Sequence, residues 1–290
     1  MVVSFMTMMP KSLHARLLKC LGEHGSGITM HVNVRDVTGR EIAPGVVERV
    51  LMGWEEGDPE GMCCARHYTL SGGGTLVLEE PMTEFQHYVI SGRTTRAPAD
   101  TAIFSPAGHH DPLKQAVGLR PQGFTHAGEG ETRIFTVAYR VPRPAFRWAK
   151  SRSRHLYETP WVNRSNIVAS QVFTEEEHAV MGALRMHALD IQTHPPGQHK
   201  GTVDEDGSLR GHRNPAEIMF FLRGTGKAMA EGAVYDVRPG SFLYTREGTE
   251  HGIWNTNDDI LEYICLEMIE HDKSWTERGY QGQTNPTPWR

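Results

Sequence analysis

The sequence predicts an all-β protein made of two similar barrels with few short helices. Short runs rich in β-branched and aromatic residues occupy residues 46–141 and 185–269, and turn residues separate them at intervals typical of sandwiches and barrels. The chain of 290 residues contains 30 Gly and 17 Pro, which favours short strands over long helices. Both stretches also contain a strand that ends in glycine, at Gly92 and Gly224, and then a hairpin and a Gly-containing turn. Such a repeat indicates a duplicated barrel.

The pattern divides the chain into five segments. They are an N-terminal arm (1–45), a first barrel (46–150), a linker with a short helix (151–183), a second barrel (184–270) and an extended tail (271–290). Residues 9–22 carry apolar side chains at helical spacing, which predicts an amphipathic helix that covers one end of a barrel or, alternatively, mediates dimerisation. Thr174-Glu-Glu-Glu177 is a capping-box pattern and predicts a helix of two or three turns that ends near Ala183.

Composition excludes several classes of function. The net charge is −5, and acidic and basic residues are interspersed, so no basic face for nucleic acid is expected. No run approaches the 18 apolar residues of a membrane span, and the first residues lack the basic start and cleavage site of a signal peptide. Cys20, Cys63, Cys64 and Cys265 form no CxxC pair and are expected to be free, buried thiols. We therefore expect a cytoplasmic protein with a small-molecule partner.

The segment between Gly211 and Asn255 contains most of the candidate metal-ligating residues. His212 and Glu217 stand just before an apolar strand, and His251 follows a glycine-containing turn and precedes another strand. Two imidazoles and one carboxylate on neighbouring strands can hold a divalent ion and leave coordination positions open. The simpler alternatives are a turn histidine bonded to nearby backbone and a solvated polar turn before a strand.

The residues of this stretch resemble the motifs of the cupin superfamily. Glu217 is followed by six residues and Gly224, as in the family's first motif, and Gly240, Gly248, His251 and Asn255 have the spacing of the second motif, with Arg246 in place of its proline. The resemblance implies a bicupin, in which two double-stranded β-helix (jelly-roll) barrels are fused and the C-terminal barrel holds the metal. In the first barrel the corresponding positions carry Phe85 and Asp111 instead of Glu and His, so we expect a degenerate copy with an architectural role.

The first motif also contains a His-x-His pair, of which one histidine is missing here. If His212 is the second member, Arg210 replaces the first; if His212 is the first member, Asn214 replaces the second. A third alternative is His199, which precedes a polar loop that can bulge out and leave this histidine near the site. We predict that His199, His212, Glu217 and His251 are the metal ligands.

The resemblance implies an enzyme that acts on a small acidic or phenolic molecule, foremost an Fe(II)-type dioxygenase. In this hypothesis Glu217 can double as a base, Arg210 can bind a substrate carboxylate, and Tyr244 faces the pocket. An isomerase, lyase or hydrolase that uses Mn, Ni or Zn is the first alternative, and a non-catalytic binding protein is the second. The resemblance also implies a homodimer.

Overall fold

The computed structural model describes eleven ranges of the chain. They are 29–55, 62–107, 110–111, 116–117, 122–141, 149, 151–164, 167–203, 209–210, 212–213 and 216–268. The expected helix over 9–22, the tail over 271–290 and Cys20 lie outside the described residues. Cys63, Cys64 and Cys265 are free and buried, as predicted. Among these ranges no helix has the length and apolar character needed to cross a membrane.

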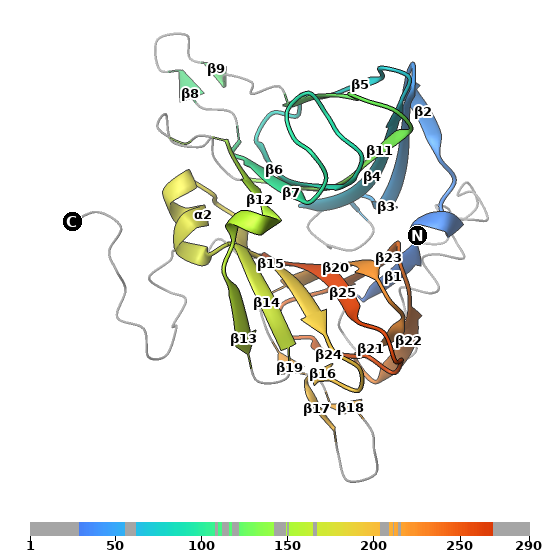
Figure 1. The fold of residues 1–290 in the computed structure, drawn as a ribbon. Helices are drawn as coiled ribbons and strands as arrows, with labels where there is room; N and C mark the ends of the chain where they lie inside the picture. The colour runs from blue at the N-terminus through green and yellow to red at the C-terminus, as the bar shows by residue number, and fades with distance from the viewer. Residues whose placement is uncertain are drawn as a thin grey trace, which may run out of the picture.

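The chain forms two β-barrels, drawn one above the other in Figure 1, and the all-β prediction is confirmed. The first barrel contains a seven-stranded sheet in the order β12-β7-β6-β11-β4-β3-β2 and the smaller pair β10-β5. Its strands are β2 (Arg40–Ala43), β3 (Val46–Met52), β4 (Cys63–Ser71), β5 (Thr75–Leu78), β6 (Thr83–Ser91), β7 (Thr101–Ser105), β10 (Gln122–Thr125), β11 (Glu131–Arg140) and β12 (Arg152–His155). The short pair β8 (His110–Asp111) and β9 (Ala116–Val117) lies in the connection between β7 and β10.

The second barrel is made of a seven-stranded sheet and a smaller sheet. The large sheet has the order β1-β23-β20-β25-β15-β14-β13, and the small one has the order β16-β24-β21-β22, with β19 also paired to β24. Its strands are β1 (Met30–Asn33), β13 (Trp161–Arg164), β14 (Ile167–Phe173), β15 (Met186–His194), β16 (His199–Lys200), β19 (His212–Arg213), β20 (Ala216–Arg223), β21 (Gly226–Ala230), β22 (Ala233–Val237), β23 (Ser241–Thr245), β24 (Glu250–Trp254) and β25 (Leu261–Met268). The hairpin of β17 (Thr202–Val203) and β18 (Leu209–Arg210) projects from its lower end (Figure 1).

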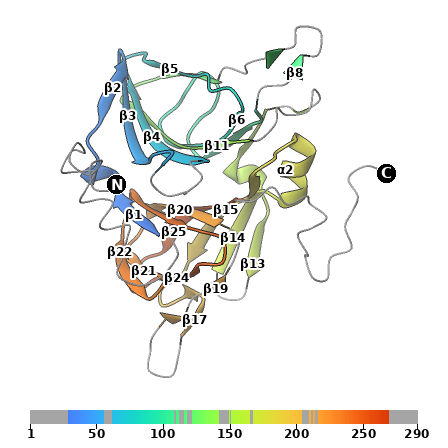
Figure 2. The same cartoon turned by 180° about the vertical axis from the view of Figure 1, so that it is seen from behind.

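Two segments expected to be connections are strands of these sheets. β1, from the predicted arm, pairs with β23 of the second barrel, and the Asn33 amide donates to the Ser241 hydroxyl at 3.2 Å. The first described strand therefore lies in one barrel and the next one, β2, in the other, as the view from behind also shows (Figure 2). The segment 151–183 contains β12, β13 and β14, so describing it as a linker with only a helix is wrong. Its strands extend both large sheets and join the barrels.

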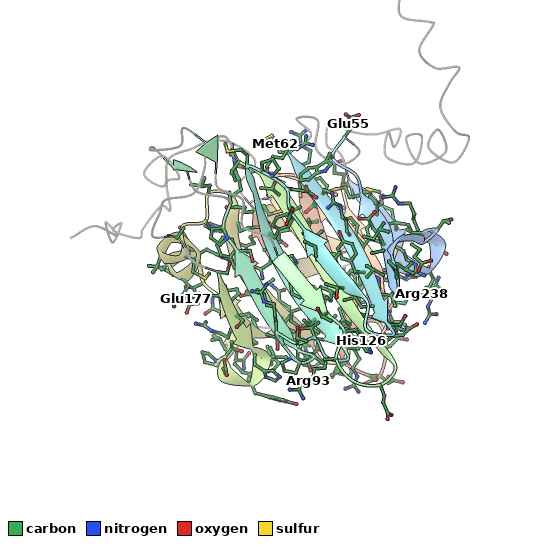
Figure 3. The ribbon with its side chains drawn as sticks, turned by 90° about the horizontal axis from the view of Figure 1, so that it is seen from above. Glu55, Met62, Arg93, His126, Glu177 and Arg238 are labelled. Atoms are coloured by element: carbon green, nitrogen blue, oxygen red, sulfur yellow. The ribbon has the colours of Figure 1, made fainter. Side chains whose placement is uncertain are left out.

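The predicted helix after residue 174 is present as α2 (Glu175–Met181), the single α-helix in the described ranges. Thr174 and Glu177 form the capping box, and Gly182 ends the helix with φ of 83°. The Arg154 guanidinium of β12 binds the Glu177 carboxylate at 2.9 Å and ties the helix to the first barrel. Figure 3 shows Glu177 at the rim of the molecule. The single-turn 3₁₀ helices η2 (Val34–Asp36) and η3 (Leu156–Glu158) complete the described elements.

Alternating residues of the strands fill three cores, because successive side chains point to opposite faces of a sheet. One core lies inside each barrel, and a third lies between the two large sheets. In the first barrel the inner core includes Phe85, Phe124 and Ile134. In the second it includes Met219, Phe221 and Leu243. The core between the sheets includes side chains from both barrels, among them Tyr88, Phe135, Phe220, Phe242 and Tyr244.

A buried carboxylate also joins the barrels. Glu84 of β6 is fully buried and accepts backbone hydrogen bonds from Leu184, Arg185 and Met186 at 2.9, 2.6 and 2.6 Å. Burial raises the pKa of this carboxyl to about 7, against the lowering effect of the three N–H groups. The carboxyl thus fixes the start of β15 on the first barrel.

Candidate functional site

The two strongest predicted ligands lie together inside the second barrel. Glu217 is the second residue of β20, and its neighbours at alternate positions, Met219 and Phe221, belong to the inner core of this barrel. His251 lies on β24 of the small sheet, which faces β20 across the barrel. Both side chains are completely buried. Nε2 of His251 lies 3.2 Å from Oε2 of Glu217.

A backbone carbonyl sets the orientation of the His251 ring. Nδ1 of His251 lies 2.8 Å from the carbonyl oxygen of Thr249, so this nitrogen carries the proton and donates it. The other ring nitrogen, Nε2, then faces Glu217. A carbonyl that fixes the tautomer from behind is the usual support of a metal-binding histidine.

A lysine that sequence reasoning overlooked is the third member of the cluster. Nζ of Lys200 lies 3.2 and 3.4 Å from the two carboxylate oxygens of Glu217. Burial lowers the pKa of Lys200, but the neighbouring Cys265 and Glu217 outweigh that effect, and the pKa lies well above its usual value. The side chain is therefore an ammonium ion, and it neutralises the buried carboxylate. A metal ion is not needed to compensate the charge of Glu217.

Cys265 of β25 completes the contacts of the carboxylate. Its thiol donates to Oε2 of Glu217 at 3.3 Å and lies 3.9 Å from Nζ of Lys200. Burial and then the charge of Glu217 raise the pKa of Cys265 well above its usual value, so the thiol stays protonated. Cys265 is therefore a neutral donor at this site.

A hydrogen-bonded chain lines the same interior on the strands β15 and β25. The Tyr263 hydroxyl donates to Oε1 of Gln192 at 2.8 Å and accepts from Nε2 of His194 at 3.0 Å. Burial and then the positive charge of Lys200 lower the pKa of His194 to about 3, so this ring is neutral. Because the charge of Lys200 acts on His194, these hydrogen-bonded residues lie close to the Glu217 cluster.

The strand register identifies the residues at the two positions of the His-x-His pair. Lys200 of β16 lies opposite Ile253 of β24, and His212 of β19 lies opposite His251. Since residues 251 and 253 are two apart, Lys200 and His212 occupy positions i and i+2 of one strand that the β17–β18 hairpin interrupts. Lys200 therefore stands at the position of the first histidine and His212 at that of the second. The side chain of His212 lies outside the described part of the structure.

The remaining predicted site residues are not part of this cluster. Nδ1 of His199 lies 2.9 Å from the carbonyl oxygen of Gly201, and His199 faces away from the interior because its neighbour Lys200 faces Glu217. The prediction that Tyr244 faces the pocket is wrong: it is buried in the core between the barrels. The backbone of Arg210 lies in the hairpin, paired with β17, and Asn214 lies outside the described residues.

The asparagine of the second motif has a structural role. Nδ2 of Asn255 donates to the carbonyl oxygens of His194 and Asp259 at 2.9 and 2.7 Å, and Oδ1 accepts from the backbone of Asn257. These bonds hold the turn after β24 against the end of β15. The glycine of the first motif is equally constrained. Gly224 has φ of 75°, and a Cβ there would lie 2.0 Å from the carbonyl oxygen of Ile260.

The interior of the first barrel holds a different polar cluster, in which Arg66 forms ion pairs with Glu48 and Glu80. Phe85, at the position expected for glutamate, is buried there and stacks on His87. Burial lowers the pKa of His87 to about 3, and its Nδ1 lies 3.0 Å from the Thr136 hydroxyl. A neutral histidine among apolar side chains fits the expected architectural role of this barrel.

An open site of two histidines and one carboxylate holds a divalent ion through three protein ligands. The described side chains supply two of them, Oε2 of Glu217 and Nε2 of His251, and no group of three His, Cys, Asp or Glu side chains within the described ranges is placed to hold an ion. The backbone of His212 lies opposite His251. An ion held by these residues would compete with the Lys200 ammonium for Glu217.

Comparison with known families gives a match in the same region. Residues 191–267 match the family model described as "Cupin domain". This range contains Glu217, His251, Lys200 and Cys265. No curated protein matches the sequence of the chain.

Solved structures share the fold over most of the chain. A protein of Pseudomonas aeruginosa described as glyoxylate-induced has a TM-score of 0.64 at 10% identity, covering 87% of this chain and 91% of its own. A mutant of Bacillus subtilis oxalate decarboxylase has a TM-score of 0.60 at 13% identity, covering 86% and 80%. A structure of that enzyme used to characterise its Mn(II) centres has a TM-score of 0.59 at 12% identity, covering 86% and 79%. Residues 191–267 therefore contain a cupin domain, and the structural likeness shows that the chain as a whole has the fold of these two-barrel proteins.

Proposed function

We propose that this protein is a metal-dependent bicupin enzyme that acts on a small acidic molecule inside its second barrel. His212, Glu217 and His251 would hold one divalent ion. The observation that carries the proposal is the buried Glu217–His251 pair, in which the carbonyl of Thr249 orients the ring so that Nε2 points to the carboxylate. Two histidines and one carboxylate with open positions are the ligand set of non-haem Fe(II) oxygenases.

In this proposal Lys200 stands where a fourth ligand, the first histidine of the His-x-His pair, would lie, and it contributes a positive charge instead of a metal ligand. Because its ammonium lies beside the fully buried Glu217 and its side chain is still 15% exposed, it can bind the carboxylate of an acidic substrate that enters the barrel. Lys200 would exchange Glu217 for the substrate when the ion occupies the site. This role replaces the one expected for Arg210 from the sequence.

Two reaction classes fit the same residues. The bound ion would supply either O2 activation together with substrate binding or Lewis-acid stabilisation of a carboxylate. Dioxygenation is the first candidate because of the three-ligand set. Decarboxylation is the second, because an oxalate decarboxylase shares this fold and because Lys200 and the Cys265 thiol are protonated groups that could supply a proton to the carbon that loses CO2.

The experiment that separates these classes combines metal analysis with gas uptake. The protein is purified without chelator, its metal content is measured, and Fe(II) or Mn(II) is restored separately. Small mono- and dicarboxylic acids and phenols are then offered with and without O2. Consumption of O2 that depends on iron and on the acid supports dioxygenation, and release of CO2 without consumption of O2 supports decarboxylation.

A metal-free binding protein is the second candidate function. The observation in its favour is the contact of Lys200 with both oxygens of Glu217, which neutralises the site without an ion. In that case the wild-type protein would bind small acids with the same affinity in chelator and in excess metal. Turnover of any acid, or acid binding that requires an ion, would rule this candidate out.

A further inference from the structure

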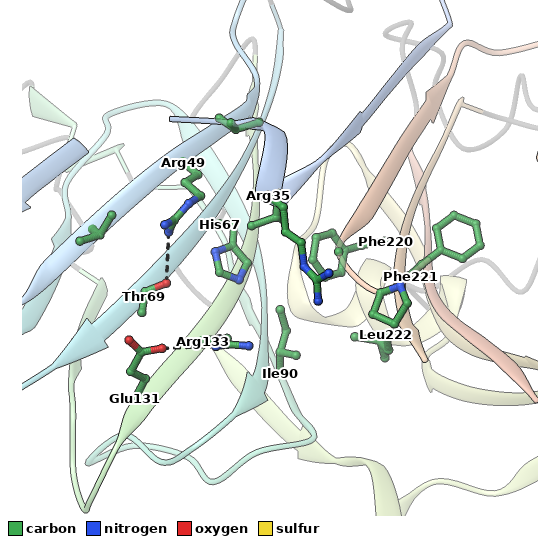
Figure 4. Close-up of a pocket in the computed structure, with 15 residues that line it drawn as sticks. Arg35, Arg49, His67, Thr69, Ile90, Glu131, Arg133, Phe220, Phe221 and Leu222 are labelled. Atoms are coloured by element: carbon green, nitrogen blue, oxygen red, sulfur yellow. Dashed lines mark hydrogen bonds and ion pairs between the residues drawn. The ribbon is translucent and has the colours of Figure 1, made fainter. Parts of the chain in front are cut away.

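A cavity with a basic lining lies between the two barrels. It has a volume of about 480 Å³ and is lined by the outer face of the first barrel, the segment around η2 and the end of β20 (Figure 4). Charged residues on its wall are Arg35, Arg49 and Arg133 against one carboxylate, Glu131. Three positive charges minus one negative charge leave a surplus of two.

The strand register brings the polar side chains of this wall together. Arg49 of β3 lies directly opposite His67 of β4, and Thr69 lies directly opposite Arg133 of β11. Opposite residues of an antiparallel pair have Cβ atoms about 4.5–5.5 Å apart. The Arg49 guanidinium also lies 3.4 Å from the Thr69 hydroxyl. Two guanidinium groups, a hydroxyl and an imidazole therefore share one small area.

A buried histidine in the middle of this area has an unused polar atom. His67 is 4% exposed, and its Nδ1 has no hydrogen-bond partner among the described residues. Burial and then the charges of Arg49 and Arg133 lower the pKa of His67 to about 4, so the ring is neutral. A buried polar atom without a partner is uncommon in proteins and indicates a missing ligand or water.

We propose that this cavity binds a small molecule with one oxyanion group, a carboxylate or a phosphate, and an apolar body. Arg49 and Arg133 can bind the oxyanion through their planar forks, and Nδ1–H of His67 can donate to it. Phe220, Ile90 and Val47 line the rest of the cavity and provide the apolar contact. Since both barrels contribute to the wall, the ligand also strengthens their packing against each other.

Binding of benzoate, phenyl phosphate and uncharged benzamide to the full chain tests this site by calorimetry. We expect saturable binding of benzoate or phenyl phosphate, and the tighter of the two identifies the oxyanion class. Arg49→Gln and Arg133→Gln should each weaken binding about tenfold, because a charge-assisted hydrogen bond is lost. Arg152→Gln, at an exposed position of β12, is the matched control and should leave the affinity unchanged.

Two further measurements locate the ligand. Glu217→Gln, in the second barrel, should leave the affinity for the oxyanion probe unchanged, and the Nδ1 resonance of His67 should shift on binding. Failure of both anionic probes to bind would overturn the proposal. Equal affinity for benzamide, or an equal loss in Arg152→Gln, would overturn it as well. Circular dichroism of each variant without ligand verifies that the fold is retained.

Discussion

Replacing Lys200 by methionine tests the charge balance of the second barrel. The variant removes the ammonium but keeps an unbranched side chain, so the fully buried Glu217 loses the positive charge of Lys200. At 3.2 Å and an effective dielectric constant of about 20, the attraction between Nζ and Oε2 is about 5 kcal/mol before the cost of desolvation. Breaking a buried pair costs about 3–5 kcal/mol, and because the Lys200 side chain is still 15% exposed we expect about 3 kcal/mol.

Urea unfolding of the chelator-treated protein measures this loss. The matched control is Lys227→Met, which breaks the surface pair of Lys227 with Asp236 and should leave the free energy of unfolding nearly unchanged, because solvent screens an exposed pair. Added divalent metal should stabilise Lys200→Met more than the wild type, because the ion no longer competes with an ammonium for Glu217. If Lys200→Met is as stable as the Lys227→Met control without metal, the charge balance described for Glu217 is incorrect.

Two further predictions concern the connection between the barrels and the first motif. The folded-state pKa of Glu84 is raised from 4.5 to about 7, so its contribution to stability is fully present below pH 4.5 and is lost as the pH rises through 7. Glu84→Gln should remove this component of roughly 3 kcal/mol from the pH dependence of unfolding, and identical wild-type and variant profiles would contradict the assignment. Gly224→Ala should destabilise the protein by more than about 2 kcal/mol in thermal melts, because its Cβ would overlap the carbonyl of Ile260. Gly232→Ala has a similar φ of 79° but open space around the new Cβ, so it should cost only about 1 kcal/mol; equal losses would show that the overlap is relieved by movement.

Much of the fold could be predicted from local sequence. Strand alternation and the glycine-ended repeat were sufficient for two barrels, and the capping box at Thr174 predicted α2. The pairing of β1 with the second barrel and the strands within 151–183 could not be predicted. Short strands at sheet edges are stabilised by partners far away in the sequence.

The site was only partly predictable for the same reason. Glu217 and His251 follow motif spacing, and the structure brings them together. The position of Lys200 could not be predicted, because eleven residues separate it from His212 in the sequence. In the sheet the two are only two register positions apart. Tyr244 was placed on the wrong face because the seven-stranded sheet is buried on both sides, so its aromatic residues do not mark the barrel interior.

Metal binding by wild-type, His212→Ala, His251→Ala and His199→Ala proteins tests the proposed centre most directly. Equilibrium dialysis against Fe(II) and Mn(II), followed by metal analysis, gives the stoichiometry without any assumption about the substrate. The proposal predicts one ion per wild-type chain, loss of that ion in His212→Ala and His251→Ala, and its retention in His199→Ala. Absence of bound metal in the wild type, or loss of the ion in His199→Ala but not in His212→Ala, would contradict it.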